Sequence, residues 1–166
     1  VVPQTSASTE KVLMVCTFGS KVVAARGTNI FTADAGGSSW TTVDSGRTSA
    51  GVYTFERFNF DGNDKLIVVD GNNAPTVFNT SFSATDVSES SVSGSKFVTA
   101  LKDHMCYAGK SSTPQEGIFS QPFDEDAFSS GSGAGSIKVD DVITGLKVFR
   151  DNLFIFCENR IFQLTG

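Results

Sequence analysis

The sequence predicts an all-β fold, a β-propeller-like repeat of about four hairpin-rich, four-stranded units that is part of a larger propeller. The first observation behind this prediction is the composition, with 15 Phe and 16 Gly among 166 residues and abundant Ser and Thr. Aromatic and β-branched side chains favour strands, whereas Gly and Ser favour turns. The second observation is a repeat in which four phenylalanines follow one another at intervals of 47, 41 and 43 residues. These intervals match the roughly 40–50 residues of a propeller blade.

Each copy of the repeat reads as an apolar strand, a tight polar turn, a second apolar strand and a hydrophobic–Phe pair. The hairpins are predicted at residues 12–25, 54–69, 96–108 and 143–156, and the matching pairs are Ile30-Phe31, Val77-Phe78, Ile118-Phe119 and Ile161-Phe162. Weak outer strands are expected at residues 40–43 and 137–139. The chain is then one propeller region or fragment over residues 1–166, with units at about 9–50, 51–93, 94–140 and 141–166, the last incomplete.

The apolar pattern inside the hairpins predicts how the units bury their side chains. Residues 66–69 and 153–156 are continuous apolar runs, which are typical of inner strands buried on both faces. No window of eleven residues has helical periodicity, so almost no helix is expected. The Ser- and Gly-rich stretches 83–95 and 129–136 are predicted to be flexible connections between units.

Charge and hydropathy restrict the classes of function. The net charge of −5 argues against a general nucleic-acid binder, whose affinity comes from Lys and Arg at phosphates. No apolar run approaches the roughly 20 residues needed to span a bilayer, and the first residues lack the pattern of a signal peptide. The chain is therefore expected to be soluble. Its start at Val1 without a Met, and its end just after an apolar segment, indicate a piece of a longer protein.

The three cysteines and the single histidine are interpreted as structural residues. Cys16, Cys106 and Cys157 each lie in an apolar run, outside any CxxC or Cys/His cluster, and are expected to be small buried hydrophobic residues. A disulfide or a metal role is the alternative. A histidine-based metal site or a Ser-His-Asp triad would depend on His104 alone, which we expect on the surface in a turn.

Three further motifs have an ordinary structural interpretation. Residues 32–40 are close to the Asp-box turn of sialidase-like propellers, with one extra residue before Trp40, and Asp34 is expected to bond to the backbone of a local turn. The acidic groups 124–126 and 140–141 could bind Ca²⁺ or act as acid and base, but they lack a calcium-loop spacing and are interpreted as solvated turns. Residues 131–135 do not fit a phosphate-binding glycine loop. No catalytic, cofactor-binding or metal-binding residue is therefore predicted.

Residues 104–128 and 137–166 resemble the tail nozzle and hub proteins of short-tailed bacteriophages. In that family a strand ending in a small residue and Gly is followed by a hydrophobic-Phe-Ser step and an acidic phrase ending in Phe. A later strand then has a Gly-Leu turn, an Asp-Asn turn, an aromatic strand and a basic close ending in Gln-Leu-Thr-Gly. These elements correspond here to Ile118-Phe119-Ser120, residues 124–128, Thr144-Gly145-Leu146, Asp151-Asn152 and residues 160–166.

The resemblance implies a structural protein of the virion tail that has no active site and is not an enzyme. Such subunits form a ring below the portal and adaptor, around the channel through which DNA leaves. The implied partners are copies of the chain and neighbouring tail proteins, with DNA only in passage. Residues 83–95 and 111–117 are then expected to make subunit contacts, and carboxylates are expected to line the channel, because DNA should slide through it.

Two other functions stay open at this point. A glycan- or receptor-binding propeller would present exposed aromatic side chains, for which Trp40 and Tyr53 are the candidates. A sialidase-like or glycosidase-like enzyme would need an arginine cluster or a carboxylate pair across the propeller axis. The arginines available for it are Arg26, Arg47, Arg57, Arg150 and Arg160. A barrel or sandwich made from the same hairpins is the alternative fold.

Overall fold

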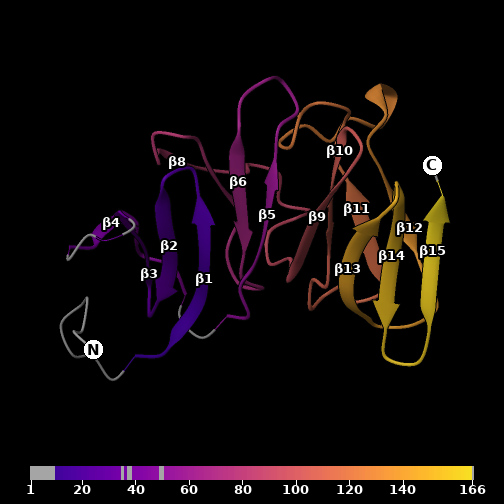
Figure 1. The fold of residues 1–166 in the computed structure, drawn as a ribbon. Helices are drawn as coiled ribbons and strands as arrows, with labels where there is room; N and C mark the ends of the chain where they lie inside the picture. The colour runs from indigo at the N-terminus through magenta and orange to yellow at the C-terminus, as the bar shows by residue number, and fades with distance from the viewer. Residues whose placement is uncertain (1–9, 35, 37–38, 49–50, 166) are drawn as a thin grey trace.

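A computed structural model describes residues 10–34, 36, 39–48 and 51–165, and every structural statement below refers to these residues. They form fifteen strands and one short 3₁₀ helix, η1 (Ser130–Ser132), so the expectation of almost no helix is confirmed for this part of the chain. The strands make four antiparallel sheets that follow one another along an open arc (Figure 1). None of the described residues belongs to a helix long and apolar enough to cross a membrane.

Each sheet is a meander in which strands adjacent in sequence pair side by side. Sheet 1 contains β1 (Val12–Phe18), β2 (Lys21–Arg26), β3 (Asn29–Asp34) and β4 (Thr41–Asp44). Sheet 2 contains β5 (Thr54–Phe58), β6 (Lys65–Val69), β7 (Thr76–Phe78) and β8 (Ala84–Asp86). Sheet 3 contains β9 (Phe97–Leu101), β10 (His104–Ala108), β11 (Glu116–Phe119) and β12 (Gly135–Lys138). Sheet 4 has three strands, β13 (Ile143–Phe149), β14 (Asn152–Cys157) and β15 (Ile161–Thr165).

The apolar core lies between neighbouring sheets. The cluster between sheets 1 and 2 contains Met14, Cys16, Phe18, Val23, Ala25, Ile30, Tyr53, Leu66, Val68 and Phe78. The cluster between sheets 2 and 3 contains Phe58, Ile67, Val69, Val87, Val92, Val98, Met105 and Tyr107. The cluster between sheets 3 and 4 contains Leu101, Cys106, Ala108, Val139, Ile143, Leu153 and Ile155. Each sheet thus depends on its neighbours for burial, as the repeat predicted.

Side chains alternate along a strand, so each sheet has two faces. We call the face toward the following sheet the forward face and the opposite one the rearward face. In β6, Leu66 and Val68 pack rearward against sheet 1, whereas Ile67 and Val69 pack forward against sheet 3. All four side chains are buried. The prediction that residues 66–69 are covered on both faces is therefore confirmed.

The second continuous apolar run is covered on one face only. Leu153 and Ile155 are buried rearward against sheet 3. Phe154 and Phe156 point forward, where no described sheet follows, and Phe156 is 39% exposed. The prediction for residues 153–156 is thus correct for the rearward face and wrong for the forward face. Burial here depends on a neighbour, and sheet 4 is the last sheet of the arc.

The hydrophobic–Phe pairs are not equivalent in all four sheets. In sheets 1, 2 and 4 the first residue of the pair faces forward and the Phe faces rearward. In sheet 3, Ile118 lies opposite Tyr107 and packs rearward, whereas Phe119 lies opposite Cys106 and packs forward. A shift of one residue exchanges the two faces of a strand. The expectation that the four pairs match is therefore wrong for sheet 3.

The Ser- and Gly-rich stretches contain regular structure rather than flexible connections alone. Residues 83–95 include β8, followed by Val87 and Val92, which are buried between sheets 2 and 3. β12 begins inside the stretch 129–136. The outer strands β4 and β12 start within two residues of the positions expected for them. The composition of these stretches did not predict this regular structure, because burying two valine side chains stabilises a segment even when most of its residues are polar.

The turn between β13 and β14 provides a first stability prediction. Arg150 and Asp151 have φ angles of 49° and 61°. In two-residue hairpin turns, Asn-Gly is the pair that usually adopts this conformation. We expect Asp151→Gly to raise stability by about 0.5 kcal/mol, because Gly adopts positive φ without the strain of a Cβ atom. Thermal unfolding measures the effect. Asp103→Gly is the matched control, since Asp103 lies in the β9–β10 turn without a positive φ, and this change should lower stability.

Candidate functional site

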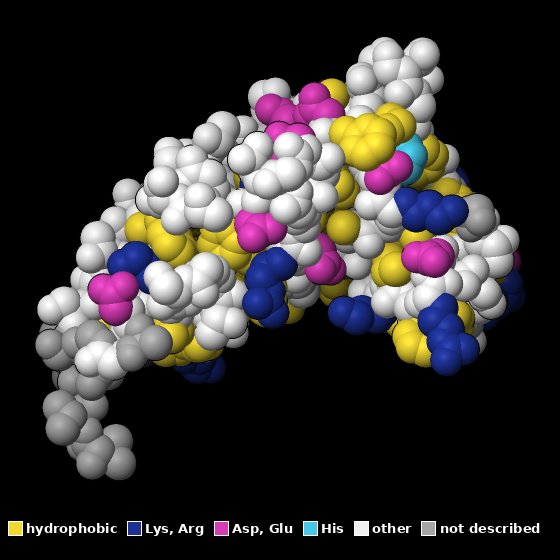
Figure 2. Space-filling view, turned by 45° about the horizontal axis from the view of Figure 1, so that its top comes forward, with side chains coloured by type: hydrophobic (Ala, Val, Ile, Leu, Met, Phe, Trp, Pro, Cys, Tyr) yellow, Lys and Arg dark blue, Asp and Glu magenta, His cyan; other side chains and the backbone are white. Residues whose placement is uncertain are grey.

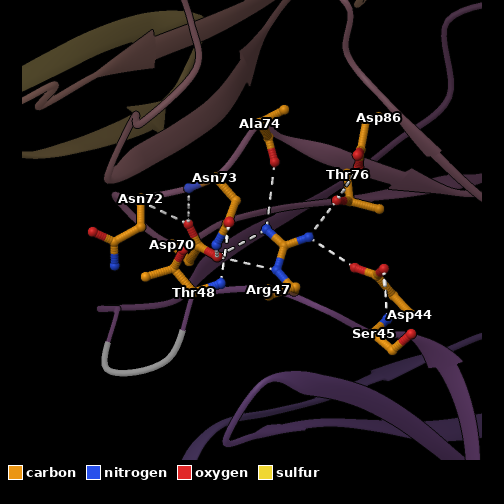
Figure 3. Close-up of polar contacts among 10 residues, drawn as sticks. All are labelled: Asp44, Ser45, Arg47, Thr48, Asp70, Asn72, Asn73, Ala74, Thr76 and Asp86. Atoms are coloured by element: carbon orange, nitrogen blue, oxygen red, sulfur yellow. Dashed lines mark hydrogen bonds and ion pairs between the residues drawn. The ribbon is translucent and has the colours of Figure 1, made fainter.

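A buried polar cluster joins sheets 1 and 2 and is centred on Arg47 (Figure 3). Arg47 lies in the connection between β4 and β5, and its backbone N–H donates to the carbonyl oxygen of Thr28 at 3.0 Å. Thr28 belongs to the turn between β2 and β3. This bond holds the connection against sheet 1 and directs the guanidinium of Arg47 toward sheet 2.

The guanidinium of Arg47 donates hydrogen bonds to both sheets. Its Nε and Nη2 atoms donate to Oδ2 of Asp70 at 3.0 and 2.9 Å. Its Nη1 atom donates to Oδ2 of Asp44 at 2.8 Å and to Oγ1 of Thr76 at 2.5 Å. Thr76 in turn donates to Oδ1 of Asp86 at 2.7 Å. One side chain thus connects the last strand of sheet 1 with Asp70, Ala74 and Thr76 around the β6–β7 connection of sheet 2.

Asp70, which follows β6, is buried and receives donors on both carboxylate oxygens. Its Oδ1 atom accepts the backbone N–H groups of Asn72 and Asn73 at 2.9 and 2.8 Å, the pattern of an Asp side chain that closes its own turn. Burial by itself would raise the pKa of Asp70. The hydrogen bonds from Asn73 and Asn72 and the charge of Arg47 outweigh it and hold this pKa below the ordinary value.

The hydrogen bonds and charges of the Arg47 cluster are suited to holding sheets 1 and 2 together, and we call such a cluster a polar anchor. Arginine does not release its proton in proteins, and both carboxylates already accept internal donors. A buried ion pair of this kind mainly penalises arrangements that separate the partners, because one of them would stay buried without its counter-charge. In the sequence, Arg47 is only one of five arginines available for an arginine cluster, and no sequence pattern predicts this site.

The depressed pKa of Asp70 makes stability depend on pH. The ionised form is stabilised by folding, so its contribution is present above the unfolded pKa of about 3.9 and is lost as pH falls through the lower folded value. We expect the difference in free energy of unfolding between the wild type and Asp70→Asn to shrink as pH decreases below about 4. Urea unfolding from neutral to strongly acidic pH measures it. A difference that stayed constant over this range would contradict the assignment.

The acidic segment 124–126 joins sheet 3 to sheet 2. Glu125 is buried and accepts a hydrogen bond from Nζ of Lys65, the first residue of β6, at 2.9 Å. Its carbonyl oxygen accepts the hydroxyl of Tyr107 at 2.8 Å. Oδ1 of Asp126 accepts the backbone N–H of Ser88 at 2.8 Å. The interpretation of this segment as a solvated turn is therefore wrong for Glu125, which is buried. Lys65 supplies its counter-charge from 60 residues away, and no sequence pattern predicts this pairing.

The second acidic group fastens the connection between sheets 3 and 4. Oδ1 of Asp141 accepts the backbone N–H of Val142 at 2.8 Å, and Oδ2 accepts the N–H of Asn159, in the β14–β15 turn, at 2.8 Å. Asp140 forms an ion pair with Arg160. Together with Arg47 and residues 124–126, these contacts give each pair of neighbouring sheets a polar anchor in addition to its apolar cluster.

The cysteines and His104 occupy structural positions. Cys16 and Cys106 are buried, as expected, and burial raises their pKa to about 11 and about 12. Cys157 is half-buried, and all three thiols are free. His104 is half-buried at the start of β10, and its Nδ1 lies 2.6 Å from the carbonyl oxygen of Ser120, so the expected surface position is only partly correct. The described residues contain no group of three or more potential ligands arranged to hold a metal ion.

An apolar cavity of about 280 Å³ lies between sheets 3 and 4. Its walls include His104, Cys106, Phe119, Ile137 and Leu164. The lining residues come from all four strands of sheet 3 and all three strands of sheet 4. Among the described residues, sheet 3 has four strands and sheet 4 has three.

The two aromatic residues proposed from the sequence for glycan binding are both at least half-buried. Tyr53 is buried between sheets 1 and 2, with its ring 5.9 Å from the guanidinium carbon of Arg47. Trp40 is half-buried. Asp34 accepts a hydrogen bond from Lys21 at 2.9 Å, while residues 35, 37 and 38 of the Asp-box-like turn lie outside the described residues. The large apolar side chains that are exposed are Val12, Val15, Val52, Phe55, Phe123, Phe149, Phe156 and Ile161.

The inner edge of the arc is formed by the first strands of the sheets, β1, β5, β9 and β13 (Figure 1). These strands contain one carboxylate, Glu56, and two basic residues, Arg57 and Lys147. Figure 2 shows Lys and Arg side chains along the concave border of the molecule. The first strands of the described sheets thus have few charged side chains of either sign.

No family model and no curated protein sequence matches the chain. Solved structures match it in fold. The computationally designed Ika4 protein aligns over 97% of this chain and 95% of its own, with a TM-score of 0.62 at 8% identity. The chain is a β-propeller module. The all-β, propeller-like fold expected from the repeat is thus confirmed.

Two further structures resemble the module over most of its length. The designed Ika8 protein aligns over 93% of this chain and 46% of its own, with a TM-score of 0.60 at 7% identity. BamB from Moraxella catarrhalis aligns over 90% of this chain and 42% of its own, with a TM-score of 0.59 at 9% identity. The propeller module spans less than half the length of these two proteins. At such identities the likeness concerns the fold alone.

Proposed function

We propose that this propeller module is a structural component of a bacteriophage tail, in the nozzle or hub, where it forms part of the wall of the DNA-ejection channel without catalysis. The proposal starts from the resemblance of residues 104–128 and 137–166 to tail nozzle and hub proteins. The observation that supports it is that the resembling residues fold into contacts between and within sheets. These contacts hold the sheets of the arc in fixed positions, as a rigid channel wall requires.

The hydrophobic-Phe-Ser step shows this in detail. Ile118 and Phe119 pack into the clusters on opposite faces of sheet 3. Ser120 is buried, and its Oγ accepts the backbone N–H of Met105 at 3.0 Å. The acidic phrase then fastens sheet 3 to sheet 2 through Glu125. Replacing any of these groups removes a contact that positions a sheet.

The mechanism of such a component is geometric. Close-packed clusters between sheets transmit load without large rearrangement, and the buried anchors penalise sliding of one sheet against another. Near the inner edge, Arg57 and Lys147 together with Glu56 leave only a small local excess of positive charge. Since tight non-specific binding requires many phosphate contacts, DNA would pass this surface without being retained.

Immunogold electron microscopy tests the proposed function. An antiserum against the recombinant chain should label the tail end of phage particles from the source material. Mass spectrometry of the labelled particles should find peptides of this chain. Label that is absent from all particles, combined with saturable binding of the recombinant chain to a glycan array, would overturn the proposal in favour of a glycan-binding propeller.

A further inference from the structure

The contact between sheets 3 and 4 is packed differently from the other two contacts between sheets. The buried members of the first two clusters include the aromatic side chains of Phe18, Tyr53, Phe78, Phe58 and Tyr107. The buried members of the third cluster are aliphatic residues and Cys106, and its phenylalanines are only partly buried. Among the described residues, the buried part of this third contact therefore lacks an aromatic ring.

The cavity of about 280 Å³ lies in this contact. Protein interiors are packed nearly as densely as organic crystals, so a void much larger than a water molecule is unusual. A cavity of about 150 Å³ with walls of Leu, Ile and Phe stays dry and binds benzene. The cavity between sheets 3 and 4 has close to twice that volume. It therefore has room for a molecule with two fused rings.

The walls of the cavity favour a neutral aromatic ligand. Among the described residues that line it, none is Asp, Glu, Lys or Arg, and most are aliphatic. A charged molecule would lose most of its hydration there. Phe119 adds an aromatic wall, because the register of β11 turns its side chain toward sheet 4. Aromatic rings attract one another in offset or edge-to-face arrangements, so this wall favours a ring over an aliphatic chain.

His104 supplies a hydrogen-bond acceptor in the same wall. Its Nδ1 atom lies 2.6 Å from the carbonyl oxygen of Ser120, and because a carbonyl oxygen can only accept, Nδ1 carries the proton. In the neutral imidazole, Nε2 then has a free lone pair. Nε2 has no hydrogen-bond partner among the described residues. A ligand with one N–H or O–H group would satisfy this acceptor.

We propose that the cavity between sheets 3 and 4 binds a neutral bicyclic aromatic molecule with one N–H or O–H group, such as an indole. The ring system fills the aliphatic volume beside Phe119, and its N–H group donates to Nε2 of His104. The lining residues all belong to sheets 3 and 4, away from the Arg47 cluster. The proposal does not depend on the phage-tail function, so its failure would leave that function untouched.

Methyl NMR and isothermal titration calorimetry of the recombinant chain test the proposal with indole as the probe. Indole should bind with a dissociation constant on the order of 0.1 mM. Its ring current should shift the methyl signals of Leu101, Leu153 and Ile155, which line the cavity. The methyl signals of Leu66 and Ile67, in the other two clusters, are the internal control and should not move. No shift at the cavity with indole near its solubility limit would overturn the proposal.

Indene tests the hydrogen bond, because it has the shape of indole with CH₂ in place of the N–H group. His104→Phe keeps a ring in the wall and removes the acceptor. This variant should bind indole about tenfold more weakly than the wild type does, and its affinity for indene should be unchanged. Because the two probes are compared on the same variant, a general loss of stability affects both alike. Equal changes for both probes would refute His104 as the acceptor.

Cys106→Phe tests the cavity itself, because the side chain of Cys106 lines it from β10. The added ring should occupy the cavity, so the variant should bind neither probe and should melt no lower than the wild type. Val23→Phe is the matched control. Val23 is likewise the third residue of the second strand in its sheet, but it is buried in a cluster that already contains aromatic rings. This control should melt several degrees lower. Undiminished binding to Cys106→Phe would overturn the location of the site.

N-acetyltryptophanamide distinguishes a free molecule from an inserted side chain, because it has the same indole group on a peptide-like backbone. It should bind about tenfold more weakly than indole, since the cavity has room for the ring system and the backbone amides would lose hydration. Binding as tight as that of indole would overturn the assignment to a small molecule, in favour of a tryptophan side chain from a partner protein.

Discussion

Asp70→Ala is expected to lower the free energy of unfolding by about 3–5 kcal/mol. The buried guanidinium of Arg47 loses the carboxylate that accepts two of its hydrogen bonds, and the backbone N–H groups of Asn72 and Asn73 lose their acceptor. Small domains are stable by only about 5–15 kcal/mol, so this change removes a large share of the total. Urea unfolding followed by circular dichroism measures it.

Asp34→Ala is the matched control for Asp70→Ala. It removes the same side chain from an ion pair, but Asp34 is 73% exposed and pairs with Lys21 at the surface. A pair of this kind contributes about 0–1 kcal/mol. Equal losses in the two variants would show that the Arg47 cluster is not an anchor.

A third variant keeps the prediction testable where Asp70→Ala is too unstable to purify. The double change Arg47→Met with Asp70→Asn removes both charges, and the Asn oxygen can still accept the backbone N–H groups of the turn. It should cost less than Asp70→Ala, because no guanidinium is left buried without its counter-charge. A greater loss in the double variant would contradict the role assigned to the charge pair.

Phe78→Ala is expected to lower the free energy of unfolding by a similar amount, about 3–5 kcal/mol. Phe78 is fully buried in the cluster between sheets 1 and 2. Its removal leaves a cavity between two sheets that touch mainly through this cluster. Because sheet 1 is the end of the arc, hydrogen exchange should accelerate first in β1 to β3.

Phe123→Ala provides the comparison for Phe78→Ala. Phe123 is 57% exposed, so the same change should alter stability by no more than about 0.5 kcal/mol. A loss confined to Phe78→Ala would locate the core between the sheets. Comparable losses in both variants would refute that description of the core.

The sequence was sufficient to predict the strands and their repetition. Alternation of apolar side chains, turn residues and the spacing of the phenylalanines are local properties of the chain, and local conformation follows them closely. Residues 66–69 illustrate this, since a short continuous run of branched apolar side chains is typical of a strand covered on both faces, and all four side chains are buried. The burial of Cys16 and Cys106 was predictable for the same reason.

The polar anchors were not predictable, because their partners are far apart in sequence. Arg47 and Asp70 are separated by 23 residues, and Lys65 and Glu125 by 60. Each of these side chains, taken alone, resembles an ordinary charged residue of a turn. Their pairing appears only when neighbouring sheets bring the turns together, and the low exposure that makes the pairing important is a property of the packed structure.

Sheet 3 and sheet 4 show what only the tertiary structure decided. The Ile118-Phe119 pair looks like the other three pairs in sequence, yet a one-residue difference in register exchanges its faces. Residues 153–156 have the pattern of a strand covered twice, and the structure covers them once. The amino-acid sequence thus determined which side chains seek burial, whereas the register and the presence of a neighbouring sheet decided where that burial occurs, because the hydrophobic effect has no direction of its own.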